Sequence, residues 1–325
     1  MTDPVDDATL ALLVEVAGTP KPGNVDRRRD LDDLRFEAFL GGAVGARPGL
    51  ERAARGTAGG AGPAVGDAFE RAVRGMADRA GTNTQFGCLL LLVPLVRAAA
   101  DPDRDLSPAG LDALCRATTV EDAVAFYRAF EAVDVAVDDP PPGADDLDVR
   151  RGSDAEPAIR DRGATLRDVL ALSADPTGGA GDGDGAADRV PDRNAAEWAE
   201  GFPRTFRAAG WILSDEGPLA DRAARAFLGL LAAEPDTLVA STQGAATARE
   251  ASGRAAALLG VDSAGPGGVG GVDAVPTDAV HGADLDAAES LADEFVAAGI
   301  NPGTTADLTC AALFVALRRG AEVAP

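Results

Sequence analysis

Residues 285–299 read LDAAESLADEFVAAG, and their apolar side chains recur at intervals of three and four residues. This spacing places them on one face of an amphipathic helix, and Gly299 marks its end. The same period returns from Ala8 to Ala17, after Ser107-Pro108, after a Thr119–Asp122 capping box and after Pro218. The alternation of apolar and polar residues that is typical of strands is nearly absent. The sequence therefore predicts an all-α fold, a single multi-helix bundle domain over residues 1–325 with no sheet of more than two short strands.

Two stretches depart from the helical pattern. Residues 138–154 contain three consecutive prolines, and residues 173–188 are dominated by Gly and Asp. Both are too polar and too rich in Pro or Gly to pack against a core. We expect them to be flexible surface loops.

The charge balance is strongly acidic. The chain has 53 acidic and 30 basic residues, which give a net charge of −23. Such a surface repels nucleic acid and anionic membranes, so neither is expected as a partner. The acidic surplus also favours adaptation to high salt, where counterions screen the repulsion, although a high-GC codon bias is the alternative.

The chain shows no sign of export or membrane insertion. Its N-terminus lacks a basic segment followed by an apolar one, and the longest apolar run, Cys88–Val96, is too short to span a bilayer. The three cysteines are far apart in apolar helical contexts, which predicts buried free thiols. The sequence thus predicts a cytoplasmic protein. Its only histidine, His281, stands outside every motif, and we expect it to be structural or exposed.

The first motif, residues 19–27, reads TPKPGNVDR. Its prolines and glycine form a rigid turn that presents Lys, Asn, Asp and Arg within a few residues, a set that suits a metal-bound polyphosphate. Lys21 is the only lysine of the chain, and its compact charge differs from the guanidinium used elsewhere. An ordinary turn at a helix end is the alternative. Glu15 lies just before, near a helix end where the macrodipole disfavours a carboxylate, so it is either solvated or held by a magnesium ion.

Two further motifs are polar turns that lead into apolar helices. Residues 81–87 read GTNTQFG, and residues 301–307 read NPGTTAD. Helix starts of this kind collect unpaired N–H groups and attract anions. Thr304 and Asp307 have the spacing of a capping box, which by itself would explain Asp307.

Together these three motifs, in this order, resemble the triphosphoribosyl-dephospho-CoA synthase family. Weaker matches begin at Asp192-Arg193 and at Asp236-Thr237. The resemblance spans nearly the whole chain and implies an all-α fold. It also implies a reaction in which a ribose hydroxyl of dephospho-CoA attacks the sugar carbon of ATP that bears adenine, which then leaves. ATP is then a substrate, Mg²⁺ an expected cofactor, and the partners are small nucleotides; the oligomeric state stays open.

The resemblance also implies roles for individual residues. Glu15, Asp26 and Asp307 are the candidate catalytic carboxylates, and the first two are the candidate metal ligands. The candidate nucleotide and phosphate contacts are Lys21, Asn24, Arg27, Asn83, Thr84, Gln85, Arg193, Asn301, Gly303 and Thr305. We expect Lys21, Asp26, Asn83 and Asp307 to share one pocket, and Lys21→Ala to weaken ATP binding with folding nearly unchanged.

The chain also departs from the better-known family members. They place Gly-x-His-x-Asp-Met after the first motif and His-Lys after Asn-Thr, whereas this chain has residues 30–35 and Gln85-Phe86 there. The first motif resembles a variant branch in which PKPGNV precedes an Asp. Another nucleotide-using transferase or kinase in cofactor biosynthesis, or a non-catalytic nucleotide-binding protein, therefore remains an alternative.

Overall fold

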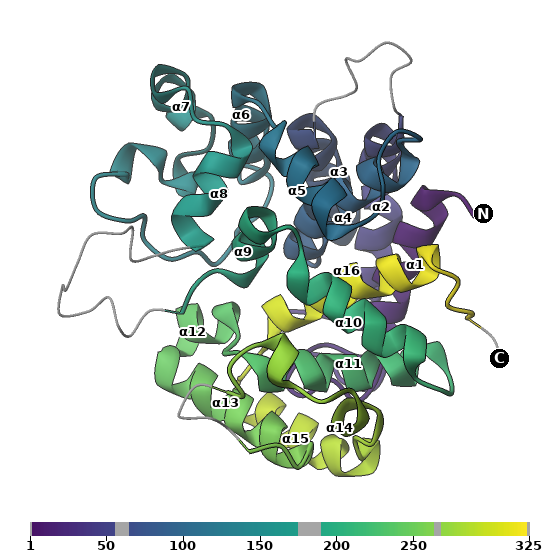
Figure 1. Ribbon diagram of the computed structural model, residues 1–325. Coiled ribbons are helices and arrows are strands. Elements are labelled where there is room, and N and C mark those ends of the chain that lie inside the picture. The colour runs from purple at the N-terminus through teal and green to yellow at the C-terminus, as the bar shows by residue number, and fades with distance from the viewer. Residues whose placement is uncertain (1, 56–64, 175–189, 263–267, 324–325) are drawn as a thin grey trace. The chain divides into compact units, whose positions relative to one another are not determined.

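Helices form the regular structure in the computed structural model, which describes residues 2–55, 65–174, 190–262 and 268–323. These residues contain sixteen α-helices and no strand (Figure 1). The prediction of an all-α fold is confirmed. None of the helices in the described ranges is long and apolar enough to cross a membrane.

Contacts group the chain into two units. Unit 1 comprises Met1–Thr9, Ala38–Ala187 and Pro191–Pro203, and unit 2 comprises Leu10–Glu37, Asp188–Val190 and Arg204–Pro325. The division falls within the first helix, between Thr9 and Leu10, and every other helix lies wholly or almost wholly in one unit. A single domain over the whole chain stays a prediction.

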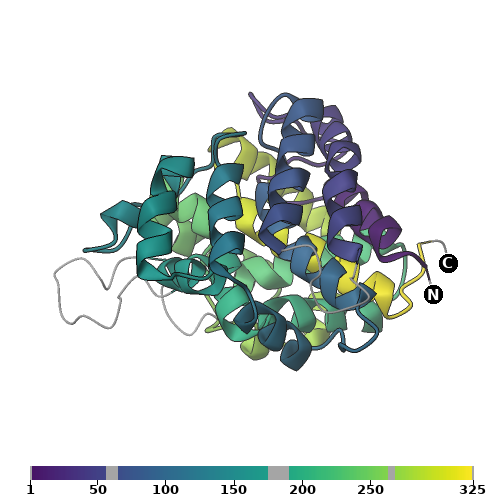
Figure 2. The same ribbon diagram turned by 90° about the horizontal axis from the view of Figure 1, so that it is seen from above.

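Unit 1 packs around aromatic side chains of three helices. Phe69 of α3 lies 5.0 Å from Phe86 of α4, and Phe126 of α6 lies 5.2 Å from Phe130, between ring centroids. The blue to teal helices lie side by side in Figure 2. The helices of this unit are α2 (Phe36–Ala54), α3 (Val65–Ala80), α4 (Phe86–Ala100), α5 (Pro108–Arg116), α6 (Val120–Ala129), η1 (Asp145–Leu147), η2 (Val149–Ala155), α7 (Glu156–Arg162), α8 (Leu166–Ala174) and α9 (Arg193–Glu200).

Helix α4 is buried on every side from Cys88 to Val96 although it contains Pro94. A proline has no N–H, so the carbonyl of Leu90, four residues earlier, loses its helical partner. The indole N–H of Trp198 in α9 donates to this carbonyl at 3.3 Å. The proline is therefore accommodated because a second helix satisfies the exposed acceptor.

Unit 2 is organised around α11, against which α13, α14, α15 and α16 pack (Figure 1). Residues Leu308–Leu317 of α16 are all buried. Its helices are α10 (Pro203–Ser214), α11 (Leu219–Ala233), α12 (Thr237–Gln243), α13 (Ala245–Leu258), η4 (Val272–Ala274), α14 (Thr277–His281), α15 (Leu285–Ala297) and α16 (Gly303–Arg318), and it also takes the end of α1 (Pro4–Ala17) from Leu10 onward.

Local sequence signals place several of these elements. The side chain of Ser107 caps α5, the Thr119–Asp122 capping box forms at the start of α6, and α15 ends just before Gly299 with its φ of 67°. All three cysteines are buried free thiols, as predicted. His281 contacts the carbonyl of Trp211 through Nε2 at 3.0 Å, which fits a structural role.

The stretch 138–154 is more structured than the sequence predicts. It includes η1 and most of η2, with Leu147 buried. The backbone N–H of Ser153 donates to Glu131 at 2.9 Å, so a carboxylate from α6's end orders this polar segment. Of the second predicted loop, residues 173 and 174 belong to α8, and residues 175–188 lie outside the described residues.

Candidate functional site

The turn after α1 carries the first motif, in unit 2. Lys21 is only 1 % exposed, and its ammonium pairs with Glu15 of α1, which is equally buried. It also donates to the side-chain oxygen of Asn24 at 2.9 Å. Buried charges must be paired and hydrogen-bonded, and this lysine has both kinds of partner.

Glu15 is thus neither solvated nor left against the helix dipole. Burial raises the pKa of the Glu15 carboxyl, and the Lys21 ammonium offsets part of that rise. The cation beside Glu15 in the structure is the ammonium of Lys21, six residues further on, whereas the sequence suggested a magnesium ion.

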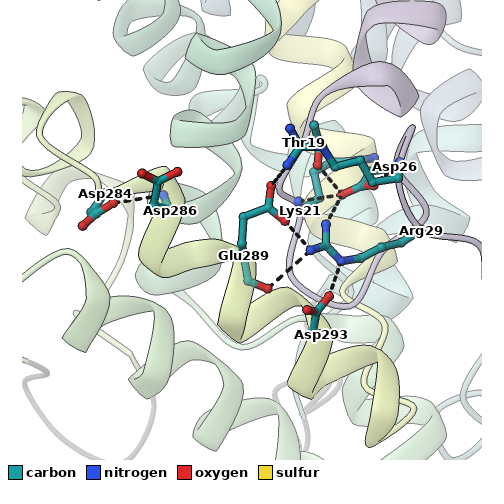
Figure 3. Close-up of polar contacts among 9 residues, drawn as sticks. Thr19, Lys21, Asp26, Arg29, Asp284, Asp286, Glu289 and Asp293 are labelled. Carbon is teal, nitrogen blue, oxygen red and sulfur yellow. Dashed lines mark hydrogen bonds and ion pairs between the residues drawn. The ribbon is translucent and has the colours of Figure 1, made fainter.

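Asp26 is fully buried and surrounded by donors (Figure 3). Its Oδ2 accepts from the hydroxyl of Thr19 at 2.8 Å and from the guanidinium of Arg29 at 3.1 Å. Its Oδ1 accepts from the backbone N–H of Arg28 at 2.8 Å. These bonds close the turn on itself, so the carboxylate holds the shape of the first motif.

Arg29 extends this cluster to α15. Its guanidinium pairs with Glu289, and its Nε donates to Asp293 at 2.7 Å (Figure 3). The turn is thus fastened to a helix more than 250 residues away in sequence. Arg27, the predicted phosphate contact, is exposed, and its contact with phosphate stays a prediction.

The first and third motifs meet in unit 2. The side-chain N–H of Asn24 donates to the side-chain oxygen of Asn301 at 2.8 Å. Gly23 has a φ of 76°, and a Cβ there would lie 1.8 Å from the carbonyl oxygen of Ile300. Glycine is therefore required at this point of the Pro-Lys-Pro-Gly turn for two reasons, its backbone conformation and the close approach. The Asn24–Asn301 contact brings these two motifs together, while the pocket predicted for Lys21, Asp26, Asn83 and Asp307 stays a prediction.

The predicted Thr304–Asp307 capping box does not form. Helix α16 starts at Gly303, and its N-cap Pro302 makes no side-chain cap. Thr304 is the second residue of α16, so it cannot be the N-cap of that helix. Asp236 supplies the missing acceptor, since its Oδ2 accepts from both the N–H and the hydroxyl of Thr305 at 2.7 Å. Asp307 follows one turn into α16 and is half-buried.

The second motif lies in unit 1, at the start of α4. The amide N–H of Asn83 donates to the carbonyl of Asp134 at 3.1 Å, and its oxygen accepts from the N–H of Phe86 at 3.2 Å. A Cβ on Gly42 of α2 would lie 2.4 Å from the Thr84 hydroxyl oxygen and 3.1 Å from Oε1 of the buried Gln85. Arg193 is the first residue of α9, in the same unit. A pocket shared by Asn83 and Lys21 stays a prediction.

The two predicted metal ligands, Glu15 and Asp26, are engaged by donors of the chain. No group of three His, Cys, Asp or Glu residues that could hold a metal occurs in the described part of the chain. Glu15 contacts an ammonium, and both oxygens of Asp26 accept N–H or O–H donors. Because these donors occupy their oxygens, Glu15 and Asp26 do not fit a magnesium pair, and Mg²⁺ stays a prediction.

Sequence reasoning missed Arg29 and Asp236. Arg29 is the last of three consecutive arginines, and nothing in that run distinguishes it from Arg27. Asp236 begins one of the weaker family matches, which was its only sequence signal.

Comparison with known proteins shows the family. The family model CitG, ATP:dephospho-CoA triphosphoribosyl transferase, matches residues 1–183 and 186–324. A crystal structure from Archaeoglobus fulgidus, described as a "putative triphosphoribosyl-dephospho-coA synthase", shares the fold with a TM-score of 0.59 at 22% identity, over 87% of this chain and 100% of that one. No curated protein matches. Since the family model covers nearly the full length, the chain belongs to the CitG family of ATP:dephospho-CoA triphosphoribosyl transferases.

Proposed function

We propose that this chain transfers the triphosphoribosyl group of ATP to dephospho-CoA at a site that includes the first and third motifs of unit 2. The observation that supports this most directly is the continuous polar chain from Glu15 through Lys21 and Asn24 to Asn301. It joins Asn24 of the first motif to Asn301 of the third, 277 residues apart. Two unrelated helix caps would have no reason to share such a contact.

In the transfer, the glycosidic bond between C1′ and adenine breaks as a ribose hydroxyl of dephospho-CoA forms a bond to C1′. The hydroxyl proton goes to a base, and adenine, which leaves with the electron pair of the broken bond, takes up one proton from an acid or from solvent, so that protons balance. The developing positive charge at C1′ favours a nearby carboxylate, and the triphosphate favours the N–H groups at a helix start.

These demands suggest a division of roles. Lys21 and Asp26 shape the turn, because their polar atoms are already engaged within it. Asn24, engaged by Lys21 and Asn301, holds the junction of the two motifs, and Asn301 contacts the nucleotide at that junction. Asp307, half-buried one turn into α16, is the base or the stabiliser of the sugar cation.

The test is release of adenine from ATP, measured by chromatography with and without dephospho-CoA. We expect adenine only when both substrates are present. Asp307→Asn should lower kcat by about 10²- to 10⁴-fold, the usual contribution of a general base. The matched control is Asp221→Asn, a half-buried aspartate in the first turn of α11, which should keep full activity.

Other outcomes would contradict the proposal. Consumption of ATP without adenine release would indicate a kinase-like reaction, and binding without turnover would indicate a nucleotide-binding protein. Full activity of Asp307→Asn would remove that residue from the chemistry.

A further inference from the structure

Asp236 links two helices of unit 2 through a single buried carboxylate. It is 2 % exposed and is the N-cap of α12, where Oδ1 accepts from the N–H of Val239 at 3.1 Å. Its Oδ2 accepts from the N–H and the hydroxyl of Thr305 in α16, both at 2.7 Å. Since Pro302 makes no side-chain cap, Asp236 caps α12 and supplies the acceptor that α16 lacks.

The same short helix contacts α16 at a second point. A Cβ on Gly303 would lie 2.5 Å from a methyl carbon of Leu238, so the first residue of α16 sits against α12. On the other side, Asn301 is bound by Asn24 and Ile300 is pressed against Gly23. The segment 300–305 is thus held between the Lys21 turn and the first turn of α12.

We propose that Asp236 is a positioning residue for the transfer reaction, holding segment 301–307 against the Lys21 turn so that Asn301 and Asp307 keep their places. This inference rests on the proposed function, because it needs that segment to meet the nucleotide. Asp236 does not touch the substrate; it acts through Thr305. A structural cap alone would affect folding and leave turnover by the folded enzyme unchanged.

The geometry defines a matched set of variants. Asp236→Asn keeps the shape, but its NH₂ group cannot accept, so it cannot serve both Val239 and Thr305. Thr305→Val removes only the hydroxyl, and Thr305→Ser retains it. The control is Asp284→Asn, because Asp284 caps only its own helix, through the N–H groups of residues 286 and 287, and asparagine is an equally good N-cap.

The experiment measures kcat and KM for ATP by adenine release with dephospho-CoA, at a temperature where circular dichroism shows each variant folded. We expect Asp236→Asn to lower kcat by about tenfold to hundredfold at saturating ATP, as for a displaced catalytic segment. Thr305→Val should also lower kcat. Thr305→Ser and Asp284→Asn should have the kcat of the parent.

Unchanged kcat in Asp236→Asn, with only a lower melting temperature, would overturn the inference while the proposed function stands. If Asp236→Asn does not fold, the two Thr305 variants decide. Equal kcat values for Thr305→Val and Thr305→Ser would overturn the inference. A lower kcat for Thr305→Val, with the parent kcat kept in Thr305→Ser, would support it. A parent that releases no adenine would overturn the proposed function itself, and this inference with it.

Discussion

Removing the charge of Lys21 should destabilise the protein strongly. In the variant Lys21→Met, the side chain keeps its length but the Glu15 carboxylate loses its countercharge while both sites remain 1 % exposed. Breaking a buried pair in this way costs about 3–5 kcal/mol in the free energy of unfolding. The side-chain oxygen of Asn24 also loses its 2.9 Å donor. This prediction differs from the sequence-based expectation that replacing Lys21 would leave folding nearly unchanged, because that expectation paired the ammonium with a bound phosphate and not with a buried carboxylate of the chain.

The assay is urea unfolding at neutral pH followed by circular dichroism. The matched control is Arg28→Met, because Arg28 also pairs with a carboxylate, that of Glu289, but its side chain is 58% exposed. Surface pairs contribute about 0–1 kcal/mol, so this variant should resemble the parent. The double variant Lys21→Met/Glu15→Gln should recover much of the loss, since no buried charge is then left alone.

The loss of stability in Lys21→Met should also depend on pH, in a direction set by the pKa of Glu15. Burial raises the pKa of Glu15 above its ordinary value of 4.5, and loss of the ammonium raises that pKa further. A raised folded pKa contributes stability that is present below the unfolded pKa and is lost as pH rises through the folded pKa. The gap between Lys21→Met and the parent should therefore narrow as pH falls toward 4.5. A Lys21→Met variant as stable as Arg28→Met at neutral pH would refute the reasoning.

Three other predictions follow from the same structure. Gly23→Ala should unfold at a lower urea concentration than Gly81→Ala and should no longer release adenine. Both glycines have a φ of 76°, but only at Gly23 would a Cβ meet a backbone oxygen, that of Ile300 at 1.8 Å. Ellman's reagent should label no cysteine in the native protein and all three after unfolding, since the thiols are buried and burial raises the pKa of Cys115 to about 12; rapid native labelling would contradict this. Unfolding midpoints should rise as salt increases into the molar range, where the Debye length falls to about 3 Å, and salt-independent midpoints would count against adaptation to high salt.

The helices were predictable because their signals are local. An amphipathic period and a cap such as Thr119–Asp122 need only a few neighbouring residues, and the structure forms that capping box as predicted. The start of α16 was predicted wrongly because its acceptor, Asp236, lies 69 residues from Thr305 in sequence. No local spacing can indicate a cap that another helix provides.

The candidate site was only partly predictable for the same reason. The motifs identified Lys21, Asn24 and Asn301 as polar residues in rigid turns, and the structure joins them in one hydrogen-bonded chain. Their roles depend on partners that sequence does not reveal. Glu15 at a helix end suggested a missing cation, yet the choice between a bound metal and a lysine of the chain required the fold.

Three carboxylates of unit 2 are buried, whereas that of Asp307 is only half-buried. Glu15, Asp26 and Asp236 are each at most 2 % exposed and accept bonds from donors of the chain. A carboxylate in such a position would weaken those bonds by taking up a proton, at about 1–3 kcal/mol for each donor left unsatisfied. Proton transfer during the reaction would then loosen the turn that positions the substrates. The three buried carboxylates are therefore suited to hold the motifs in place, and a role of the half-buried Asp307 toward the substrates stays a proposal.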